Sequence, residues 1–384
     1  MNDLVVGMSL LTQGADQFTG TATYVRELLR EFGQRTGHVR VHGLCNRHAL
    51  ANFNGCASPA VKLTAAKYPM GDNRATRAVA VTAARLTARH LARQFADDAC
   101  VVHYPLTLDV PSVRLPTVLT LHDVLHHDLP QHFSSAGRLW RRIYYDAPAR
   151  RATLVHTVSM FSKARIVDRL GVDADRVVVI PHGVDHLRFK PEPDNRDEAL
   201  LESFDLPDRF LFYPATLWAH KNHLKLLDAL KLVEEQELHL VLCGATVGRL
   251  HEILAAAEQR GLAQRVCHLG FVADAALPAV YRRATALAFP SVYEGFGTPP
   301  LEAMAAGCPV ASTLVGPLAE VCGGAAVELM PDDPRQMAEA IDLVAGDPQL
   351  RARLRAAGLE HAATFSWARA ADAHLDAYTR ARGM

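Results

Sequence analysis

Short apolar runs alternate with helical stretches along almost the whole chain, and this rhythm limits the fold more than any other feature of the sequence. In the first half, the runs typical of strands are LVVGMSLL, VRVHGL, ACVVHY, TVLTLHD, TLVHTVS and RVVVIP. In the second half they are FLFYPA, LHLVLCGA, RVCHLGF, ALAFPS, PVAST and AAVELM. Continuous apolar strands that alternate with helices predict parallel sheets covered by helices on both faces. The sequence therefore predicts an α/β chain with two doubly wound domains.

The position of the domain boundary follows from composition. The chain has 384 residues, enough for two domains at roughly 100–200 residues each. Residues 185–199 are charged, carry two prolines and lack periodicity, which is typical of a linker. The last predicted strand is followed by helical stretches, and no further strand comes after them. We therefore expect the end of the chain to cross back, so that residues 1–185 and 366–384 form one domain and residues 186–365 the other.

The overall composition excludes several classes of protein. Lys plus Arg and Asp plus Glu number 41 each, so net charge gives no reason to expect a nucleic-acid partner. A hydrophobic content of 49% argues against a disordered chain. The sequence has no apolar run of about eighteen residues that predicts a membrane span, and its start, MNDLVVGMSLL, lacks a basic signal-peptide region. Seven scattered cysteines without C-x-x-C fit reduced thiols. We expect a cytoplasmic protein.

The segment SVYEGFGTPPLEAM, residues 291–304, places Glu294 and Glu302 on either side of a turn. Its glycines and prolines forbid a continuous helix or strand, and its apolar flanks predict a strand end, a shaped loop and a helix start. The prolines at 299 and 300 suit a first helical turn, where their missing N–H costs nothing. A helix start of this kind attracts a diphosphate through its free N–H groups. The alternative is an ordinary strand–helix loop.

The familiar nucleotide motifs do not fit the sequence. Gly7, Gly14 and Gly20 lack the spacing of the dinucleotide fingerprint G-x-G-x-x-G, and the third glycine position of GFGTPP is occupied by Pro300. The sequence also has no Walker loop. These departures argue against a dehydrogenase and against a P-loop ATPase.

Two segments contain residue types that bind metals. The D-x-D of Asp173 and Asp175 lies in the short link between a helix and a strand, where a solvated turn is the simpler interpretation. The segment HDVLHHDLPQH is rich in histidine, but it is predicted to be a strand end and loop rather than a helix with ligands on one face. We therefore expect neither a metal ion nor another cofactor.

Two isolated residues are candidates for chemistry. His122 and Asp123 end the predicted strand TVLTLHD, at the edge of the sheet where ligands bind in open α/β folds. A histidine there can donate or accept a proton near neutral pH; a structural histidine is the alternative. Lys221 is predicted to open a helix, where the helix dipole disfavours a cation. A bound anion would resolve that conflict, and a surface lysine is the alternative.

A basic segment, RATRAVAVTAARLTARHLARQF, begins at Arg74 and ends at Phe95. It has five arginines and no acidic residue, and Val79, Leu86, Leu91 and Phe95 would give it an apolar surface. A basic amphipathic helix favours an anionic membrane surface, and a solvated helix is the alternative. Membrane binding through this segment would place the protein on the inner face of the cytoplasmic membrane.

Together these segments resemble the large family of GT-B-fold retaining glycosyltransferases that build bacterial polysaccharides and glycolipids. The family signature, a glutamate, seven residues and a second glutamate, is matched in EGFGTPPLEAMAAGCPV. VSMFSKARIVDRLGVDADRVVVIPHGVD, HKNHLKLLDAL and GFVADAALPAVYRRATALAFPS are also similar to the family. The resemblance implies two Rossmann-like domains that face a cleft, with an acceptor-binding N-terminal domain, a donor-binding C-terminal domain and a C-terminal helix that returns to the first.

The resemblance also implies roles for single residues. Glu302 would hold the donor ribose, Glu294 would lie near the transferred sugar, and Lys221 would bind the diphosphate. His122 would lie beside the sugar and the acceptor, and Gly20 in a loop that faces the diphosphate. His122, Lys221 and Glu294 form the implied catalytic set. The remaining implied substrate contacts, which include a base pocket around residues 271 and 272, are Asp123, Thr216, His220, Phe271, Val272, Gly295, Phe296, Gly297, Thr298 and Leu301.

One departure from the family concerns the charge of the diphosphate. Thr216 stands where many members carry an arginine, and His220 precedes Lys221. Charge compensation would then fall to a protonated His220 or to an arginine from elsewhere in the chain. The surrounding sequence, YPATLWAHKNH, resembles that of a subgroup of mannosyl- and rhamnosyltransferases. This resemblance favours GDP-mannose as the donor over a UDP-sugar.

The family resemblance implies transfer of a hexose to a saccharide or lipid-linked saccharide in surface polysaccharide or lipopolysaccharide synthesis. It also implies retention at the anomeric carbon without a metal ion. The rival hypotheses are a GT-B-fold epimerase or phosphorylase and a non-catalytic nucleotide-binding scaffold subunit.

Overall fold

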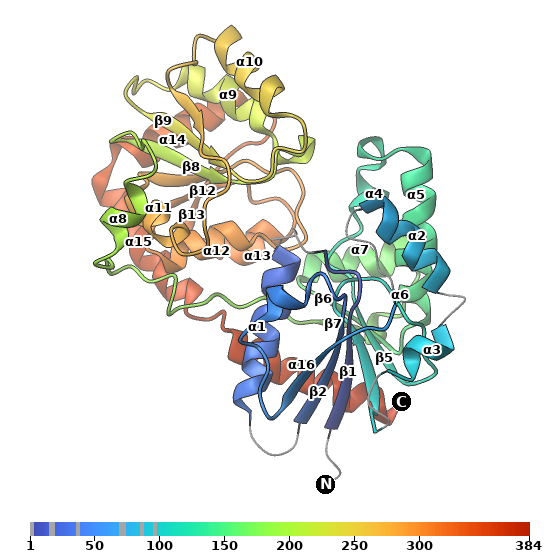
Figure 1. The fold of residues 1–384 in the computed structure, drawn as a ribbon. Helices are drawn as coiled ribbons and strands as arrows, with labels where there is room; N and C mark the ends of the chain where they lie inside the picture. The colour runs from blue at the N-terminus through green and yellow to red at the C-terminus, as the bar shows by residue number, and fades with distance from the viewer. Residues whose placement is uncertain (1–3, 15–19, 36–38, 69–73, 85–87, 95–97) are drawn as a thin grey trace. The chain divides into compact units, whose positions relative to one another are not determined.

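The protein consists of two compact units, each built on one parallel sheet (Figure 1). The computed structural model describes residues 4–14, 20–35, 39–68, 74–84, 88–94 and 98–384. Unit 1 comprises Met1–Gly183 and Trp367–Met384, and unit 2 comprises Val184–Ser366. Among the described residues, no helix is both long enough and apolar enough to cross a membrane.

The sheet of unit 1 has seven strands in the described part of the chain, in the order β3-β2-β1-β4-β5-β6-β7, and every pairing is parallel. The strands are β1 (Leu4–Leu10), β2 (Val39–Cys45), β3 (Val61–Ala65), β4 (Val101–Tyr104), β5 (Thr117–Thr120), β6 (Leu154–Thr157) and β7 (Val177–Val179). The expected doubly wound architecture is thereby confirmed for this unit.

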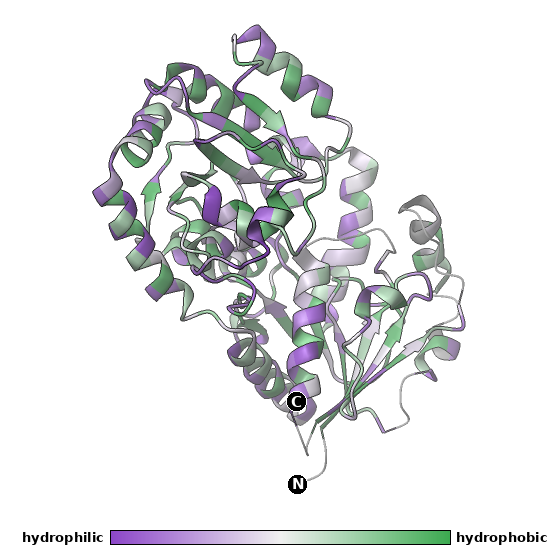
Figure 2. Cartoon of the chain, turned by 60° about the vertical axis from the view of Figure 1, so that its left-hand side comes forward, coloured by the Kyte–Doolittle hydropathy of each residue, from purple (hydrophilic) through white to green (hydrophobic). Residues whose placement is uncertain are grey.

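Consecutive side chains of these strands point to opposite faces of the sheet, so a continuous apolar strand contributes to two cores. Val101 packs in the cluster on one face and Val102 in the cluster on the other. Leu154 and Val155 divide between the two faces in the same way. Figure 2 shows strands that are largely hydrophobic and helices whose polarity alternates along their length.

Helices cover both faces of this sheet. They are α1 (Gly20–Gln34), α2 (Arg74–Ala84), α3 (Ala88–Ala92), α4 (Leu125–Asp128), α5 (Ser135–Arg141), the π-helix η3 (Arg142–Asp146), α6 (Ala147–Arg151), α7 (Met160–Leu170) and α16 (Trp367–Gly383). Short 3₁₀ turns are η1 (Leu50–Phe53), η2 (Pro130–His132) and η4 (Ala174–Arg176). The bounds of α7 follow from local chemistry: Ser159 caps its start by accepting from the Ser162 N–H, and Gly171 ends it in the left-handed conformation.

The last helix, α16, packs against α1 and the sheet of unit 1, as the pattern of the tail predicts (Figure 1). Two buried hydrogen bonds fix it there. The Tyr378 hydroxyl lies 2.7 Å from Nδ1 of His103 on β4, and Nε2 of His374 lies 2.8 Å from the Tyr24 hydroxyl on α1. These polar groups are paired inside an apolar core, and pairing is what makes their burial tolerable.

The sheet of unit 2 has six parallel strands in the order β10-β9-β8-β11-β12-β13. Its strands are β8 (Phe210–Pro214), β9 (His239–Cys243), β10 (Val266–His268), β11 (Ala286–Phe289), β12 (Val310–Ser312) and β13 (Ala326–Glu328). Its helices are α8 (Asp197–Leu201), η5 (Ala219–Lys221), α9 (His223–Leu232), α10 (Leu250–Gln259), α11 (Leu277–Arg283), α12 (Thr298–Ala305), α13 (Pro317–Cys322), α14 (Pro334–Gly346) and α15 (Pro348–Ala362). Every strand in this unit corresponds to an apolar run identified in the sequence.

The basic segment from Arg74 to Phe95 differs from its predicted form. Its described residues form α2 and α3, while residues 85–87 and 95 lie outside the described residues. Leu91 is fully buried in the core of unit 1, so our expectation that it belongs to an exposed apolar surface is wrong. Val79 is 70% exposed, as that expectation requires. Leu91 is buried because α2 and α3 pack on the sheet, so an apolar side chain on the inner face of these helices lies in the core.

Candidate active site

The loops that follow β8 and β11 lie side by side in unit 2. These two strands are neighbours, and the chain continues from β8 toward one edge of the sheet and from β11 toward the other. At such a reversal point, open α/β sheets bind ligands beyond the carboxyl ends of the strands. The Val292 N–H donates to the His220 carbonyl at 2.9 Å and ties the two loops together. The reversal point therefore brings together predicted site residues that are about 70 positions apart in the chain.

Lys221 and Glu294 form an ion pair between these loops. Nζ of the lysine lies 2.5 Å from Oε1 of the glutamate, and only 16% and 12% of the two side chains are exposed. Lys221 ends the 3₁₀ turn η5, and α9 begins only at His223. Our prediction that the lysine opens a helix is therefore wrong, because Asn222 takes a left-handed φ of 62° and separates the turn from the helix.

The start of α12 is shaped by one glycine. Gly297 has a φ of 109°, and a Cβ there would lie 2.5 Å from a methyl carbon of Leu318. No other residue fits this position without displacing Leu318. Pro299 and Pro300 occupy the first turn, and no side chain caps the helix. Pro299 and Pro300 carry no N–H, so the N–H groups at this helix start that have no partner within the helix are those of Gly297 and Thr298, and these two can bind a ligand.

Glu302 is the fifth residue of α12 and lies in its second turn. Its Oε2 accepts a hydrogen bond of 3.1 Å from the Tyr281 hydroxyl. Burial raises the pKa of this carboxyl to about 7, although Arg188 and the Tyr281 hydroxyl act in the opposite direction. Arg188 in turn lies 3.5 Å from Asp274. A carboxyl held in this way is well placed to accept hydrogen bonds from hydroxyl groups.

The other residues predicted to contact the donor differ in how far their side chains are exposed. Phe271 is 68% exposed, whereas Val272 is buried. Phe296 and Leu301 are also buried, so only their main chains could contact a ligand. The partly exposed predicted residues are Thr216, His220, Gly295 and Thr298.

Unit 1 has a pocket at the equivalent point of its own sheet. The strand order reverses between β1 and β4, and the pocket is lined by residues that follow β1, β4 and β5. Its volume is about 330 Å³. The lining residues are Thr12, Gln13, Thr21, Leu106, Thr107, Leu108, Leu121, His122, Asp123 and Tyr145. Two residues predicted from the sequence, His122 and Asp123, thus line a cavity at the carboxyl edge of a parallel sheet.

His122 follows β5 by two residues, and its environment holds it neutral. Burial lowers the pKa of the ring to about 4, although a hydrogen bond with the Pro105 carbonyl acts in the opposite direction. The ring packs edge-on against Tyr24 and His182, with ring centres 5.6 Å apart in both pairs. Its Nε2 is buried and has no hydrogen-bond partner among the described residues. At neutral pH, His122 is therefore a neutral imidazole, with one nitrogen that no described residue engages.

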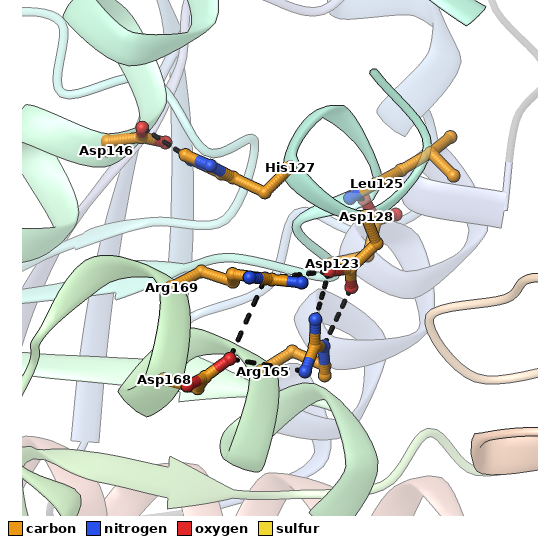
Figure 3. Close-up of polar contacts among 8 residues, drawn as sticks. All are labelled: Asp123, Leu125, His127, Asp128, Asp146, Arg165, Asp168 and Arg169. Atoms are coloured by element: carbon orange, nitrogen blue, oxygen red, sulfur yellow. Dashed lines mark hydrogen bonds and ion pairs between the residues drawn. The ribbon is translucent and has the colours of Figure 1, made fainter. Parts of the chain in front are cut away.

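The residues just after His122 are held by a backbone hydrogen bond and by ion pairs (Figure 3). Asp123 accepts the Leu125 N–H at 2.9 Å and so shapes the start of α4. At the end of α4, Asp128 forms ion pairs with Arg165 and Arg169 of α7. These contacts fix the segment that carries the two pocket residues.

Gly20 is the first residue of α1, and residues 15–19 before it lie outside the described residues. A Cβ added to Gly20 would meet no atom of the described residues within 4 Å. The described part of the fold therefore does not require glycine at this position.

Comparison with known proteins places these sites in a family. A family model described as Glycosyltransferase Family 4 matches residues 18–188, and one described as Glycosyl transferases group 1 matches residues 200–361. The crystal structure of HepE from Anabaena with UDP and glucose superposes with a TM-score of 0.77 at 20% identity, covering 98% of this chain and 100% of that one. O-antigen chain mannosyltransferase B of Escherichia coli is 30% identical over 278 residues, 70% of this chain and 72% of the relative. The chain belongs to the GT-B-fold glycosyltransferases.

Another relative in this GT-B family is longer than the chain. The serotype-specific mannosyltransferase WbdA of Escherichia coli is 28% identical over 284 residues, which are 71% of this chain and 35% of WbdA. The chain thus spans about a third of the length of that relative.

Thr216 occupies the position where the family resemblance implies an arginine, and the structure places Arg249 at the same loop. Nη1 of Arg249, just before α10, lies 3.0 Å from the Leu217 carbonyl, next to Thr216 in the chain. Its guanidinium also forms an ion pair with Glu252. Arg249 and Lys221 both lower the pKa of His223, after the larger effect of burial, so both cations lie near that ring. The sequence does not single out Arg249, because it is 33 positions from Thr216.

Two clusters of described residues have ligand atoms close enough for a metal ion. In the first, His126 and His127 each place Nε2 2.8 Å from one oxygen of Asp146. Burial raises the pKa of this carboxyl, but the two imidazole hydrogen bonds outweigh burial and leave the pKa below its usual value. The hydrogen bonds satisfy the cluster as it stands, and we assign it no ion.

The second cluster combines His103, His156 and His374 in the core of unit 1. Nε2 of His103 and Nδ1 of His156 lie 2.8 and 2.9 Å from the Thr120 hydroxyl. The remaining ring nitrogens contact Tyr378, Tyr24 and backbone carbonyls. A complete set of hydrogen bonds is again possible without an ion. The D-x-D aspartates, Asp173 and Asp175, are exposed at the turn η4, as the sequence predicts.

Proposed function

We propose that this protein is a retaining, metal-independent glycosyltransferase. It would move a hexose from a nucleoside-diphosphate sugar to a saccharide or lipid-linked saccharide acceptor in bacterial surface-polysaccharide synthesis. The observation that carries the proposal is the Lys221–Glu294 pair beside the uncapped start of α12. We place GDP-mannose first as the donor, which the mannosyltransferase names of two relatives support. A UDP-sugar is the second candidate, since HepE was solved with UDP and glucose.

The donor would bind in unit 2. Its ribose hydroxyls would donate to Glu302, and its base would stack on the exposed face of Phe271. Lys221 and the N–H groups at the start of α12 would face the diphosphate. Charge that develops on the leaving diphosphate would thus meet a fixed cation and oriented amides, an arrangement that often supplies the largest part of catalysis. This arrangement supplies the positive charge that a metal ion provides in other nucleotide-sugar enzymes.

The transfer step would occur on one face of the sugar. The bond between the anomeric carbon and the diphosphate oxygen breaks, and a bond from an acceptor hydroxyl oxygen to the same carbon forms. The departing diphosphate oxygen takes the proton of that hydroxyl, so no protein base has to be regenerated. His122, neutral at pH 7, would position the transferred sugar or the acceptor by hydrogen bonding rather than by charge.

The test is a transfer assay with purified protein in the presence of EDTA. GDP-mannose and a panel of UDP-sugars are each offered with a mannose-terminated oligosaccharide, and the products are analysed by mass spectrometry and anomeric NMR. We expect a product one hexose longer, with the anomeric configuration of the donor. Nucleotide release without a longer product from any acceptor, or an inverted product, would contradict the proposal. An epimerase would instead change the donor, and a phosphorylase would require inorganic phosphate.

A variant of His122 separates chemistry from donor binding. His122→Ala should lower turnover by roughly 10²–10³, because a well-placed polar group at a reacting centre can contribute that much. The affinity for the nucleoside diphosphate should stay unchanged, since His122 belongs to unit 1 and the nucleotide would bind in unit 2. Normal turnover in the folded variant would assign His122 a structural role.

A further inference from the structure

Arg188 lies in residues 185–199, which the sequence predicts to be a linker, but hydrogen bonds fix its backbone within unit 2. Its N–H donates to Oδ1 of Asp185 at 3.1 Å, and the N–H of Phe189 donates to the Asp185 carbonyl at 2.8 Å. The Phe189 ring is buried in the fold. The side chain of Arg188 therefore extends from a fixed turn.

The guanidinium of Arg188 has two partners, but they do not satisfy it fully. Nη1 lies 3.5 Å from Oδ2 of Asp274, and Cζ lies 4.4 Å from the centre of the Phe189 ring, within range of a cation–π contact. Nε is buried and has no hydrogen-bond partner among the described residues. The Asp274 side chain is 50% exposed, and ion pairs at the surface contribute little to stability. Such a pair does not by itself account for a partly buried arginine with an unpaired N–H.

The positive charge of Arg188 acts on Glu302. Burial has the largest effect on this carboxyl and raises its pKa to about 7, whereas Arg188 and the hydrogen bond from Tyr281 favour the ionised form. Asp274 opposes ionisation because it carries a like charge. The Cys243 thiol also faces Glu302, but burial raises its pKa to about 12, so it stays neutral. Near neutral pH, a neighbouring cation therefore has a large influence on how much of this carboxyl is ionised.

Ionisation of Glu302 matters because a ribose offers it hydroxyl donors. A carboxylate accepts with both oxygens, whereas a protonated carboxyl carries an O–H that donates. Hydrogen bonds to an ionised acceptor are also roughly twice as strong as those between neutral groups. Glu302 is partly exposed, while Nε of Arg188 is buried, so a ligand can reach the carboxyl without reaching that nitrogen.

We propose that Arg188 is a positioning residue of the donor site: held by Asp274 and Phe189, it keeps the Glu302 carboxyl ionised for the donor ribose. Arg188 acts through Glu302 and does not itself bind the donor. Asp274 has two opposing effects, because it holds the arginine and also disfavours ionisation of Glu302. The inference rests on the proposed function and adds to it a residue that sets how donor binding depends on pH.

The first test measures the ionisation of Glu302 directly, by NMR titration of labelled glutamate carboxyl carbons in the full-length protein without nucleotide. The Glu302 signal is identified by its absence from Glu302→Gln. We expect the midpoint to rise by about one pH unit or more in Arg188→Met, because a nearby opposite charge favours the ionised carboxyl by about that amount. Arg188→Lys keeps the charge and should restore most of the difference.

Asp274→Asn should move the midpoint in the other direction, because it removes a like charge beside Glu302. This residue is half exposed, so the exchange is mild for the fold. A purely structural role of the Arg188–Asp274 pair predicts no opposite shifts. An unchanged midpoint in Arg188→Met, or shifts of the same sign in the two variants, would overturn the inference.

The second test measures the affinity for GDP and UDP by calorimetry. At about pH 6.5, Arg188→Met should bind about five- to tenfold more weakly than wild type, and at about pH 8.5 within a few-fold, because the carboxyl ionises there without help. Each comparison with wild type is made at one pH, which cancels the titration of the nucleotide phosphate. An equal loss at both pH values would contradict the inference, since Arg188 would then contact the nucleotide itself.

Arg209→Met is the matched control. Arg209 directly precedes β8 at the amino end of the sheet, and its Nε lies 2.7 Å from Glu235. The exchange removes an ion-paired arginine at the sheet edge opposite to the donor site, so the Glu302 midpoint and the affinity ratios should not change.

The outcomes separate this inference from the proposed function. Failure of the wild type to bind GDP and UDP would remove the proposed function, and the carboxyl titration, which needs no nucleotide, would still decide the effect of Arg188. Normal nucleotide binding and transfer, together with an unchanged midpoint in Arg188→Met, would remove only the inference.

Discussion

Because Glu294 is paired with Lys221, we expect alanine mutants of Glu294 and Glu302 to lose different properties. Glu302→Ala deletes the carboxyl that we expect to accept from ribose hydroxyls. A hydrogen bond to a charged group contributes about 1.5–3 kcal/mol, and about 1.4 kcal/mol corresponds to a tenfold change in affinity. Because burial raises the pKa of Glu302 to about 7, the carboxyl is fully charged only at higher pH. Calorimetry with the bare nucleoside diphosphate above that pKa should therefore show a loss of affinity of roughly 10- to 150-fold.

Glu294→Ala instead removes the ion-pair partner of Lys221. The ammonium group then has no carboxylate to neutralise it, so the bare nucleotide should bind within a few-fold of wild type or more tightly. Turnover with the intact donor should fall strongly, because Glu294 would face the transferred sugar. Glu294→Gln, which keeps the size of the side chain, distinguishes loss of charge from loss of volume. Equal losses of nucleotide affinity in the two alanine mutants would show that the pair has been assigned wrongly.

Arg249 is the described cation best placed to compensate for the missing family arginine. Arg249→Ala should weaken nucleoside-diphosphate binding about tenfold, the lower end of the range for charged hydrogen bonds, because Glu252 shares its charge. The effect should diminish as salt is added. The double mutant Thr216→Arg/Arg249→Ala should regain affinity, since it restores the arrangement common in the family.

A second arginine in the same unit provides the control. Arg260 follows the end of α10 and is paired with Asp228, so Arg260→Ala removes a similar ion pair outside the loop of Thr216. Nucleotide affinity that falls equally in both arginine mutants, or in neither, would remove Arg249 from the donor site and leave His220 as the remaining candidate.

At the scale of elements, central strands are predictable because they are continuous apolar runs. β3 is not predicted from the sequence, because it is an edge strand in which only Val61 is buried and partial burial leaves no continuous apolar run. Nor are α5 and the π-helix predicted, because they expose Leu139 and Ile143 and so lack a clean apolar stripe. Both omissions have one cause: periodicity reports burial, and these elements are only partly buried.

Candidate site residues divide in the same way. The motif around Glu294 and Glu302 is contiguous, so it is visible in the sequence. Other residues are recognised only in the folded structure. Arg188 and Arg249 are identified by contacts with residues far away in the chain, and Thr107 by its positive φ. A single sequence carries no local signal for such residues.

The exposed face of α5 and the π-helix is a second candidate for a membrane surface, besides the predicted basic segment. Leu139 and Ile143 are 58% and 39% exposed, and Arg142 between them is exposed as well. Apolar side chains beside a cation suit the interface of an anionic membrane. We expect Leu139→Glu/Ile143→Glu to reduce sedimentation with phosphatidylglycerol vesicles by about tenfold or more, because two charges replace apolar contacts.

The matched control changes two exposed leucines of unit 2. Leu232 and Leu343 are 49% and 52% exposed, so Leu232→Glu/Leu343→Glu alters net charge and surface polarity to the same extent. Binding that is lost in both double mutants would reflect net charge alone, and binding retained in both would exclude this face. The basic segment itself is tested by changing the arginines at 85, 89 and 93 to glutamate. Of these three side chains, the structure describes only that of Arg93, which is exposed.

For the whole molecule, the buried histidines of unit 1 predict sensitivity to acid. Burial lowers the pKa of His374 to about 4 and the pKa values of His103 and His156 well below the usual value. These rings stay neutral in the fold, while the unfolded chain takes up protons below about pH 6.5. The free energy of unfolding is therefore fully present above that pH. It should fall by about 1.4 kcal/mol per pH unit for each histidine as the pH drops toward the folded pKa.

Urea unfolding at about pH 7.5 and about pH 5 measures this effect. His374→Gln should be less stable than wild type at the higher pH, because it disturbs the contact with Tyr24. The variant should nevertheless lose less stability between the two pH values, since one fewer proton is taken up on unfolding. His132→Gln serves as the exposed-histidine control. Identical pH dependence in wild type and His374→Gln would show that this ring does not contribute.

The position of α16 has a consequence for the order in which the protein is made. This helix completes a core that begins with β1, yet the ribosome synthesises it after all of unit 2. N-terminal domains usually fold first during synthesis, but here the nascent unit 1 must wait with part of its apolar surface uncovered. Unit 2 is contiguous and can close first. A chaperone that shields exposed apolar surface would therefore have its longest engagement with the first half of the chain.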